Sequence, residues 1–305
     1  MKPKDVLMLG ALAAIWGGSF LFLRIGVPAL GPVVLIEVRV LLASAALLGF
    51  ALVARQPVRV AHRWWQYLVL GAANAAVPFT LIAAAELRID VGLAAILNAT
   101  TPVFTALVAW AWSRARLTPM KIAGVVLGVA GVGVLVGGGK AMHGIWAWLP
   151  AAFSLLAALS YGVANVFSER YFRGEKPLDI AIGQQLGATL LLLPISLLFL
   201  PHARPDGVVI VSVLMLAVVC TAVAYLLYFA LIHSVGALRT STVTFLVPVF
   251  AVIWGALFLG ESISLRMALG LLVILSSVAL IAGGGKIRTE SGQALQTDAG
   301  HRPEG

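Results

Sequence analysis

Ten apolar runs of about twenty residues each dominate the sequence and leave only short segments between them. A helix that crosses the hydrocarbon core of a bilayer needs about 20 mostly apolar residues. Transmembrane β-strands would instead alternate in hydrophobicity over about ten residues, and these runs do not alternate. We therefore predict an all-α polytopic membrane protein with ten transmembrane helices, at 6–24, 33–53, 66–85, 91–112, 120–138, 145–168, 179–200, 207–232, 237–258 and 265–284.

The composition excludes a water-soluble fold. Of the 305 residues, 61% are hydrophobic and 11% are charged, whereas about 25% of a soluble domain is charged. The single cysteine, Cys220, excludes a disulfide framework. The net charge of +9 does not indicate a nucleic-acid partner, because the basic residues are distributed between the apolar runs.

The second half of the chain repeats the layout of the first. Counting on from Pro102 and Pro248, Gly124 corresponds to Gly270, and the two copies align without a gap over 102–140 and 248–286. Such self-similarity fixes the architecture. Because each half holds five spans, the halves enter the membrane from opposite sides, as in transporters whose site lies at the repeat interface near the midplane. We assign 6–139 to the first repeat, 145–285 to the second, and 286–305 to a disordered cytoplasmic tail.

The positions of lysine and arginine predict the orientation. With the N-terminus in the cytoplasm, fifteen of these residues lie inside, five lie outside, and Arg39 lies within a span. This bias predicts a multi-pass protein of the cell inner membrane with both termini cytoplasmic. Lys2 and Lys4 before the first run are also typical of a signal peptide, but the run is too long and lacks a clear cleavage site before Arg24.

Two prolines mark the middle of the protein. Pro102 and Pro248 lie about 11 residues into their spans, which is about 16 Å along a helix and close to the midplane. A helix proline leaves the carbonyl four residues earlier without its partner, here that of Asn98 or Thr244. In lipid, such backbone must face protein or a water-filled cavity. Either the breaks line a central cavity, or they are structural kinks whose carbonyls bond neighbouring threonines.

Polar and aromatic side chains deep in the spans are the other candidates for a substrate cavity. Intramembrane polar groups are costly unless they bond each other or line water. For each of them, a hydrogen bond between helices remains the alternative to substrate contact. The cavity candidates are Trp16, Asn74, Asn98, Thr101, Pro102, Tyr161, Asn165, Gln184, Tyr225, Tyr228, Thr244 and Pro248.

Glu37 and Arg39 are the charges that lie clearly within a span, about 7–10 Å from its outer start. Residues two apart on a helix do not face each other, so the two are not expected to pair. With Arg24 they are candidates for an outer gate that attracts anions. The alternative is a structural ion pair, for which Arg24, Glu86 and Asp90 are the possible partners.

The sequence contains no pattern of residues that is typical of an enzyme active site. The histidines fall in loops, span ends or the tail, and no His and acidic residues have metal-ligand spacing. No glycine-rich loop matches the phosphate-binding pattern. We therefore predict no catalytic residue, no metal and no cofactor. Gly124, Gly128 and Gly131 are expected to allow close helix packing and not to bind a ligand.

Several short motifs, in this order, resemble the EamA-type family of the drug/metabolite transporter superfamily. They are AIWGGSF at 14–20, RVLLA at 39–43, DVGLAA at 90–95, LSYGVAN at 159–165 and LGES at 259–262. The resemblance covers about 6–285. It implies ten helices in two repeats, cytoplasmic termini, a central substrate cavity and the export of amino acids or other metabolites. The family often has an acid after glycine in both repeats, whereas here Glu261 has Ala115 as its counterpart.

Two functions remain open. The first is a carrier that exports a small amphipathic metabolite by alternating access, with the lipid bilayer and a small molecule as its partners. The second is a membrane scaffold without transport activity, which would have no central cavity that water can reach. The sequence predicts neither the oligomeric state nor the energy source.

Overall fold

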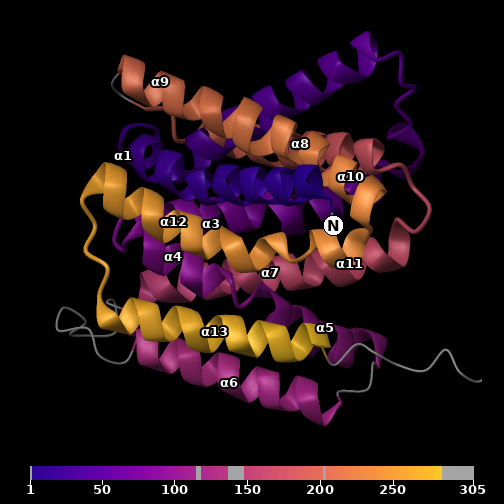
Figure 1. Ribbon diagram of the computed structural model, residues 1–305. Helices are drawn as coiled ribbons and strands as arrows, with labels where there is room; N and C mark the ends of the chain where they lie inside the picture. Colours follow the sequence, from indigo (N-terminus) through magenta and orange to yellow (C-terminus); the bar gives the residue numbers. More distant parts are fainter. Residues whose placement is uncertain (1, 115–117, 137–147, 202–203, 284–305) are drawn as a thin grey trace, which may run out of the picture.

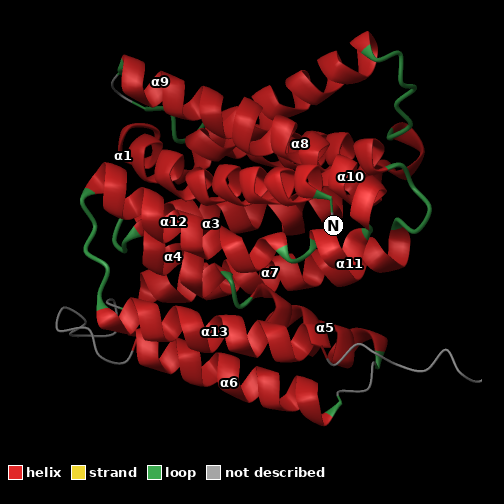
Figure 2. Cartoon of the chain, viewed as in Figure 1, coloured by secondary structure: helices red, strands yellow, loops and turns green. Residues whose placement is uncertain are grey.

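A computed structural model describes residues 2–114, 118–136, 148–201 and 204–283. These residues form helices and connecting turns, with no strand in the described ranges (Figures 1 and 2). Eight helical segments are long and apolar enough to cross a membrane. The first of them folds back on itself and supplies two crossings, and a shorter apolar helix at Val243–Leu259 supplies one more. The described chain therefore has the ten crossings of a multi-pass membrane protein.

The helices follow each other along the chain with short connections. The first half comprises α1 (Pro3–Val53), η1 (Ala61–Arg63), α2 (Trp64–Gly71), η2 (Ala72–Ala76), α3 (Val77–Glu86), α4 (Val91–Asn98), α5 (Thr101–Ser113) and α6 (Pro119–Val136). The second half comprises α7 (Leu149–Tyr171), α8 (Pro177–Ser196), α9 (Gly207–Leu214), η4 (Met215–Val223), α10 (Ala224–Val235), α11 (Ala237–Thr240), α12 (Val243–Leu259) and α13 (Leu265–Gly283). The predicted tail at 286–305 lies outside the described residues.

The first two spans are joined by a single non-helical residue. The sequence predicted a connection at 25–32, but helix α1 is continuous up to Gly31, whose φ of 71° and ψ of 161° are non-helical. Glycine has no Cβ and adopts a positive φ at little cost. Pro32 follows and suits the first position of the next helical stretch. The chain therefore reverses within α1 (Figure 1), and Gly26 packs closely against Leu35 across the turn.

The two proline spans are broken at different positions, which corrects the prediction of matching breaks. In the first repeat, α4 ends at Asn98 and Pro102 is the second residue of α5. In the second repeat, Pro248 lies inside α12, and the break comes earlier, between α11 and α12. The hydroxyls of Thr242 and Thr244 donate to carbonyls three residues back, at 2.7 and 2.8 Å. Such local bonds compete with the helix and favour a turn there.

The two repeats interlock through glycines. The first span of each repeat crosses the proline helix of the other repeat. A Cβ on Gly17 would lie 2.7 Å from the Phe250 Cβ, and a Cβ on Gly162 would lie 2.9 Å from the Phe104 carbonyl carbon. Gly17 and Gly162 are 145 residues apart, and Phe104 and Phe250 are 146 apart. The same contact therefore occurs twice, as expected for the predicted inverted duplication.

The last spans of the two repeats, α6 and α13, pair along one side of the bundle (Figure 1). A Cβ on Gly124 would lie 2.9 Å from the Ser277 carbonyl oxygen, and one on Gly131 would lie 2.9 Å from the Ile274 side chain. Ser277 Oγ also donates to the Gly124 carbonyl at 2.6 Å. The prediction that these glycines allow close helix packing is confirmed.

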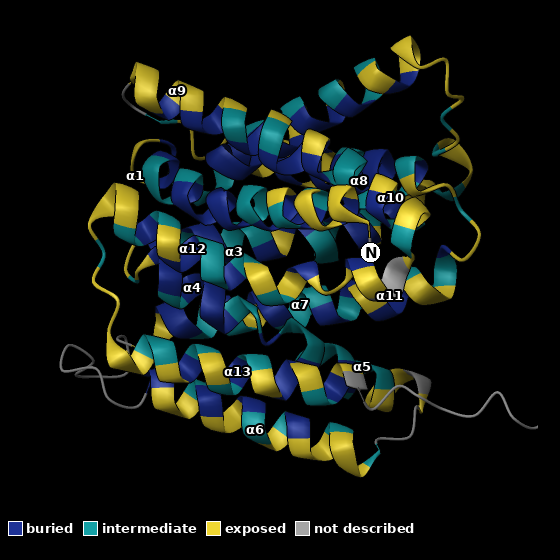
Figure 3. Cartoon of the chain, viewed as in Figure 1, coloured by how far each residue is buried: buried dark blue, intermediate teal, exposed yellow. Residues whose placement is uncertain are grey.

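The outer surface of the bundle is apolar. Side chains such as Val126, Val129, Leu190 and Leu257 are more than 60% exposed, although they lie within spans. Exposed residues mark the outward sides of α6, α9 and α13 in Figure 3. An apolar surface of this extent suits contact with lipid. The large buried side chains face the interior, where segments from both repeats meet.

Candidate functional site

Two π-helical segments lie at equivalent positions in the two repeats. Segment η2 occupies Ala72–Ala76, and the 146-residue shift that relates Pro102 to Pro248 carries it to 218–222, inside η4 (Met215–Val223). A π-helix widens the turn, leaves the regular backbone pattern, and occurs frequently at functional sites. Each segment lies in the third span of its repeat. The candidate site is built around these two segments.

Gln184 of α8 joins the two repeats at η2. Its side-chain oxygen accepts a hydrogen bond from Asn74 Nδ2 at 2.7 Å, and its Nε2 donates to the Tyr225 hydroxyl at 2.6 Å. Gln184 is 2% exposed, so this chain of bonds is an interior one. The structure thus brings together three of the predicted cavity residues, one from the first repeat and two from the second.

Arg39 of α1 makes the equivalent contact at η4. Its Nε donates to Thr221 Oγ1 at 3.1 Å, and its guanidinium carbon lies 3.9 Å from the centre of the Phe79 ring. Arg39 is 3% exposed. Tyr161 of α7 lies beside Phe79, with the two ring centres 6.3 Å apart. Arg39 therefore lies among interior side chains, although the sequence proposed it for an outer gate.

Aromatic rings from both repeats continue the site along α1 and α10. The rings of Trp16 and Tyr228 lie 5.5 Å apart, and Phe229 lies 5.9 Å from both Tyr225 and Tyr228. Trp16, Tyr225 and Tyr228 are each half-buried, although they lie well inside their spans. The predicted residues on this side of the bundle are therefore neighbours.

The first proline break lies beside α7. Thr101 Oγ1 donates to the Asn98 carbonyl at 2.7 Å, so a neighbouring threonine bonds the carbonyl that Pro102 leaves free. The Asn98 side-chain oxygen is buried and has no hydrogen-bond partner among the described residues. Asn165 of α7 donates to Thr105 one turn further along α5, at 3.2 Å.

The second proline helix contributes less to this group. Thr244 is exposed and donates to the Ser241 carbonyl, and Pro248 is buried within α12. Within the described ranges, no hydrogen bond or ring contact joins either residue to the other predicted cavity residues. Hydrogen bonds and ring contacts thus link five candidates into one group: Trp16, Asn74, Gln184, Tyr225 and Tyr228. Among the described residues, such contacts do not join the residues of either proline helix to this group.

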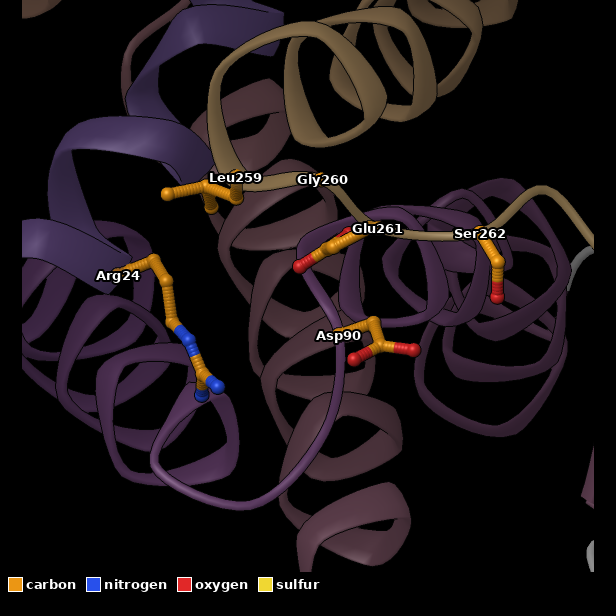
Figure 4. Close-up of a pocket in the computed structure, with 6 residues that line it drawn as sticks. All are labelled: Arg24, Asp90, Leu259, Gly260, Glu261 and Ser262. Atoms are coloured by element: carbon orange, nitrogen blue, oxygen red, sulfur yellow. The ribbon is translucent and has the colours of Figure 1, made fainter.

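Arg24 lines an open pocket of about 410 Å³ (Figure 4). The pocket includes Leu259, the last residue of α12, and this end of α12 lies opposite the N-terminus (Figure 1). Asp90 and the segment 259–262 form the rest of its wall, and the Arg24 guanidinium faces the carboxylates of Asp90 and Glu261. In the described part of the chain, none of these groups is within 4 Å of an opposite charge. Of the three residues proposed for an outer gate, Arg24 is the one that lies at this end.

Glu37 and Glu86 are buried carboxyl groups. They are 3% and 0% exposed, and their oxygens have no hydrogen-bond partner among the described residues. Glu86 lies in electrostatic range of both Arg24 and Arg39. Neither forms an ion pair with Arg39 in the described ranges, in agreement with the expectation that Glu37 and Arg39 do not pair.

Glu261 has a structural role that the sequence did not predict. Its two carboxylate oxygens accept from the backbone N–H groups of Val91 and Gly92 at 2.8 and 3.3 Å. These groups begin helix α4, where a negative charge stabilises the exposed N–H groups. A loop of the second repeat thus caps a helix of the first. Its counterpart Ala115 lies outside the described residues.

Sequence reasoning also missed Phe79 and Thr221, the two partners of Arg39. Phe79 looked like an ordinary apolar residue, and Thr221 lies beside the single cysteine in an apolar run. The repeat could have indicated Phe79, because it lies 146 residues before the cavity candidate Tyr225 and is therefore its counterpart in the first repeat.

The family comparison agrees with this architecture. Residues 4–137 and 148–283 each match the model of the EamA-like transporter family. The two matched ranges correspond to the two repeats and together cover most of the chain.

Full-length relatives and a solved structure are also similar. The chain is 25% identical to the uncharacterized transporter YvbV of Bacillus subtilis, over 92% of each protein. It is 27% identical to the uncharacterized inner membrane transporter YedA of Escherichia coli, over 90% of each. It is 27% identical to a probable amino-acid metabolite efflux pump of Salmonella typhimurium, over 94% of this chain and 98% of the pump. A solved crystal structure has a TM-score of 0.63 at 18% identity, covering 92% and 96% of the two chains, which shows a shared fold.

Proposed function

Because the chain belongs to the EamA-like transporter family, we propose that it carries a small amphipathic metabolite across the cell membrane. The similarity to a probable amino-acid metabolite efflux pump supports an amino acid or related compound as the substrate class, and export as the direction. Transport proceeds by alternating access, in which the two repeats move relative to each other around a central site.

The contact between Gln184 and Asn74 carries this proposal. It joins the second span of one repeat to a π segment of the other, and Arg39 and Thr221 make the equivalent contact. Polar groups in a bilayer are retained where they bind a substrate or each other. Two sets at equivalent positions between inverted repeats match the location of substrate sites in carriers with this symmetry.

The orientation belongs to the same proposal. The N-terminus and the far end of α13 lie at one end of the bundle, which we assign to the cytoplasm from the excess of lysine and arginine there (Figure 1). A fluorescent protein fused after Gly305 is expected to fluoresce, and alkaline phosphatase at the same position is expected to be inactive. The reverse result would contradict the orientation.

Transport is tested with the purified full-length chain in liposomes. The vesicles are loaded with a panel of labelled amino acids and small carboxylates, amides and amines, and efflux is measured against vesicles without protein. We expect efflux of a subset of the panel, and a loss of about tenfold or more on Gln184→Leu, because Asn74 and Tyr225 then lose their shared partner. No efflux of any compound would contradict the proposal.

The scaffold alternative is separated by water access to the site. Single cysteines replace Tyr161 and Tyr225 in a chain whose native Cys220 is changed to alanine. A carrier exposes both positions to a charged thiol reagent in at least one of its states, whereas a scaffold without a central cavity protects both. Protection of both positions would favour the scaffold.

A further inference from the structure

The duplication provides an internal comparison of the two halves of the site. Arg39 lies seven residues after Pro32, and Gln184 lies seven residues after Pro177, so the two occupy the same position in the second span of their repeats. Each bonds the π segment of the opposite repeat. Each also contacts an aromatic ring of its own repeat, Phe79 or Tyr225. The two side chains are therefore equivalents under the approximate twofold relation.

The equivalents differ in how fully their hydrogen-bonding groups are used. The Gln184 side chain both accepts and donates, and its two polar atoms each have a partner. The Arg39 guanidinium has five N–H donors, of which one bonds, to Thr221, within the described residues. The three ion pairs in the described ranges involve other residues, so no carboxylate lies within 4 Å of Arg39.

A buried arginine without an anionic partner is costly. The guanidinium keeps its charge in proteins, and a charge held inside a membrane bundle needs a partner. Glu86 interacts with Arg39 only at longer range. The remaining donors form a planar fork that matches the two oxygens of a carboxylate. The ring of Phe79 holds this fork in place from one side, and Thr221 fixes Nε.

We infer that Arg39 binds the carboxylate of the transported compound. The inference rests on the proposed function and names its substrate class: a small carboxylate with an apolar part. Tyr161 and Tyr225 lie in electrostatic range of Arg39, and both residues are half-buried. They form apolar surface beside the fork, while the Gln184 half of the site supplies no charge. The substrate is therefore held by its acidic end in one half of a nearly symmetric site.

Binding is tested with matched pairs of compounds that differ in the carboxylate alone. The pairs are phenylacetate and phenylacetamide, and N-acetyl-leucine and N-acetyl-leucinamide. The full-length protein in phosphatidylcholine nanodiscs is titrated with each, and affinity is measured from the shift in its thermal unfolding. Loss of charged hydrogen bonds changes affinity by roughly 10- to 100-fold. The wild type is expected to prefer each carboxylate by this factor, and Arg39→Gln to abolish the preference with the amide affinity unchanged.

Controls separate a binding role from a structural one. Arg266→Gln removes a charge from an exposed arginine at the start of α13 and is expected to leave the preference unchanged. If Arg39→Gln does not fold, Thr221→Val keeps the charge and removes its anchor, and the preference for carboxylate is expected to fall several-fold. The inference would be overturned if Arg39→Gln or Thr221→Val left the preference for carboxylate unchanged. It would also be overturned if the wild type bound the amide as tightly as the acid.

The outcome also separates this inference from the proposed function. If the wild-type protein moves neutral or cationic compounds in liposomes but binds no carboxylate, the inference fails and the proposed function stands. If it binds and moves no compound of any class, both fail.

Discussion

Replacing Gly71 by alanine tests a close backbone contact between the two repeats. A Cβ on Gly71 would lie 2.5 Å from the Ala188 backbone nitrogen and 2.5 Å from the Gln184 carbonyl oxygen. Ordinary contact begins at 3.4 Å, so α2 and α8 must separate by about 0.9 Å. The atoms in the way belong to the backbone, which has no alternative rotamer. The separation would stretch the 2.7 Å bond from Asn74 to Gln184 beyond hydrogen-bond range.

The expected cost follows from these changes. Overpacking of this kind costs about 1–3 kcal/mol, and the lost bond adds about 1 kcal/mol. The better helix propensity of alanine offsets up to about 1 kcal/mol. The net loss of about 1–3 kcal/mol should lower the apparent unfolding temperature by about 2–12 °C, at about 2–4 °C per kcal/mol for a large domain.

The chain contains its own reporter for this measurement. Cys220 is the single cysteine and is 2% exposed, so a thiol-reactive dye labels it when the bundle opens. Gly49→Ala is the matched control, because a Cβ at that position meets no atom within 4 Å. We expect the control to unfold at or slightly above the wild-type temperature. If Gly71→Ala unfolds within 1 °C of the control, the close contact of α2 with α8 is refuted.

Three further substitutions test other contacts. Glu261→Ala removes the cap of helix α4 and should cost about 1–2 kcal/mol in the same dye assay, whereas unfolding at the wild-type temperature would contradict the cap. Ser277→Ala removes the donor to the Gly124 carbonyl and should cost about 1 kcal/mol, and an unchanged unfolding temperature would refute that bond. Gln184→Leu should lower the transport rate by about tenfold or more, and full transport would contradict a role for its bond to Tyr225.

The sequence predicted the spans and the two repeats because run length and internal repetition can both be read directly from the order of the residues. A run of about 20 apolar residues has few alternatives to a membrane helix. The glycines of α6 were assigned to helix packing for the same kind of reason, since small residues at a spacing of three or four share a face. Gly124 and Gly131 do contact α13.

The arrangement of the site could be predicted only in part. Depth along a span indicated that Gln184 and Asn74 lie inside the membrane, and the structure joins them. Depth does not indicate which way a side chain turns, and Arg39 was therefore assigned to an outer gate. The π segments change the direction in which the neighbouring side chains point, and no pattern of residues in the sequence predicted these segments. The second break was misplaced because proline was given more weight than the hydroxyl of Thr242.

The one-residue turn at Gly31 has a consequence for biogenesis. The two arms of α1 are joined without a polar loop, so the insertion machinery has no hydrophilic segment to translocate between them. The pair can then enter the bilayer together as a preformed hairpin, with the backbone of both arms already bonded. An epitope inserted at this turn would require a hydrophilic segment to pass through the membrane. The two arms would then enter the bilayer one after the other instead of together.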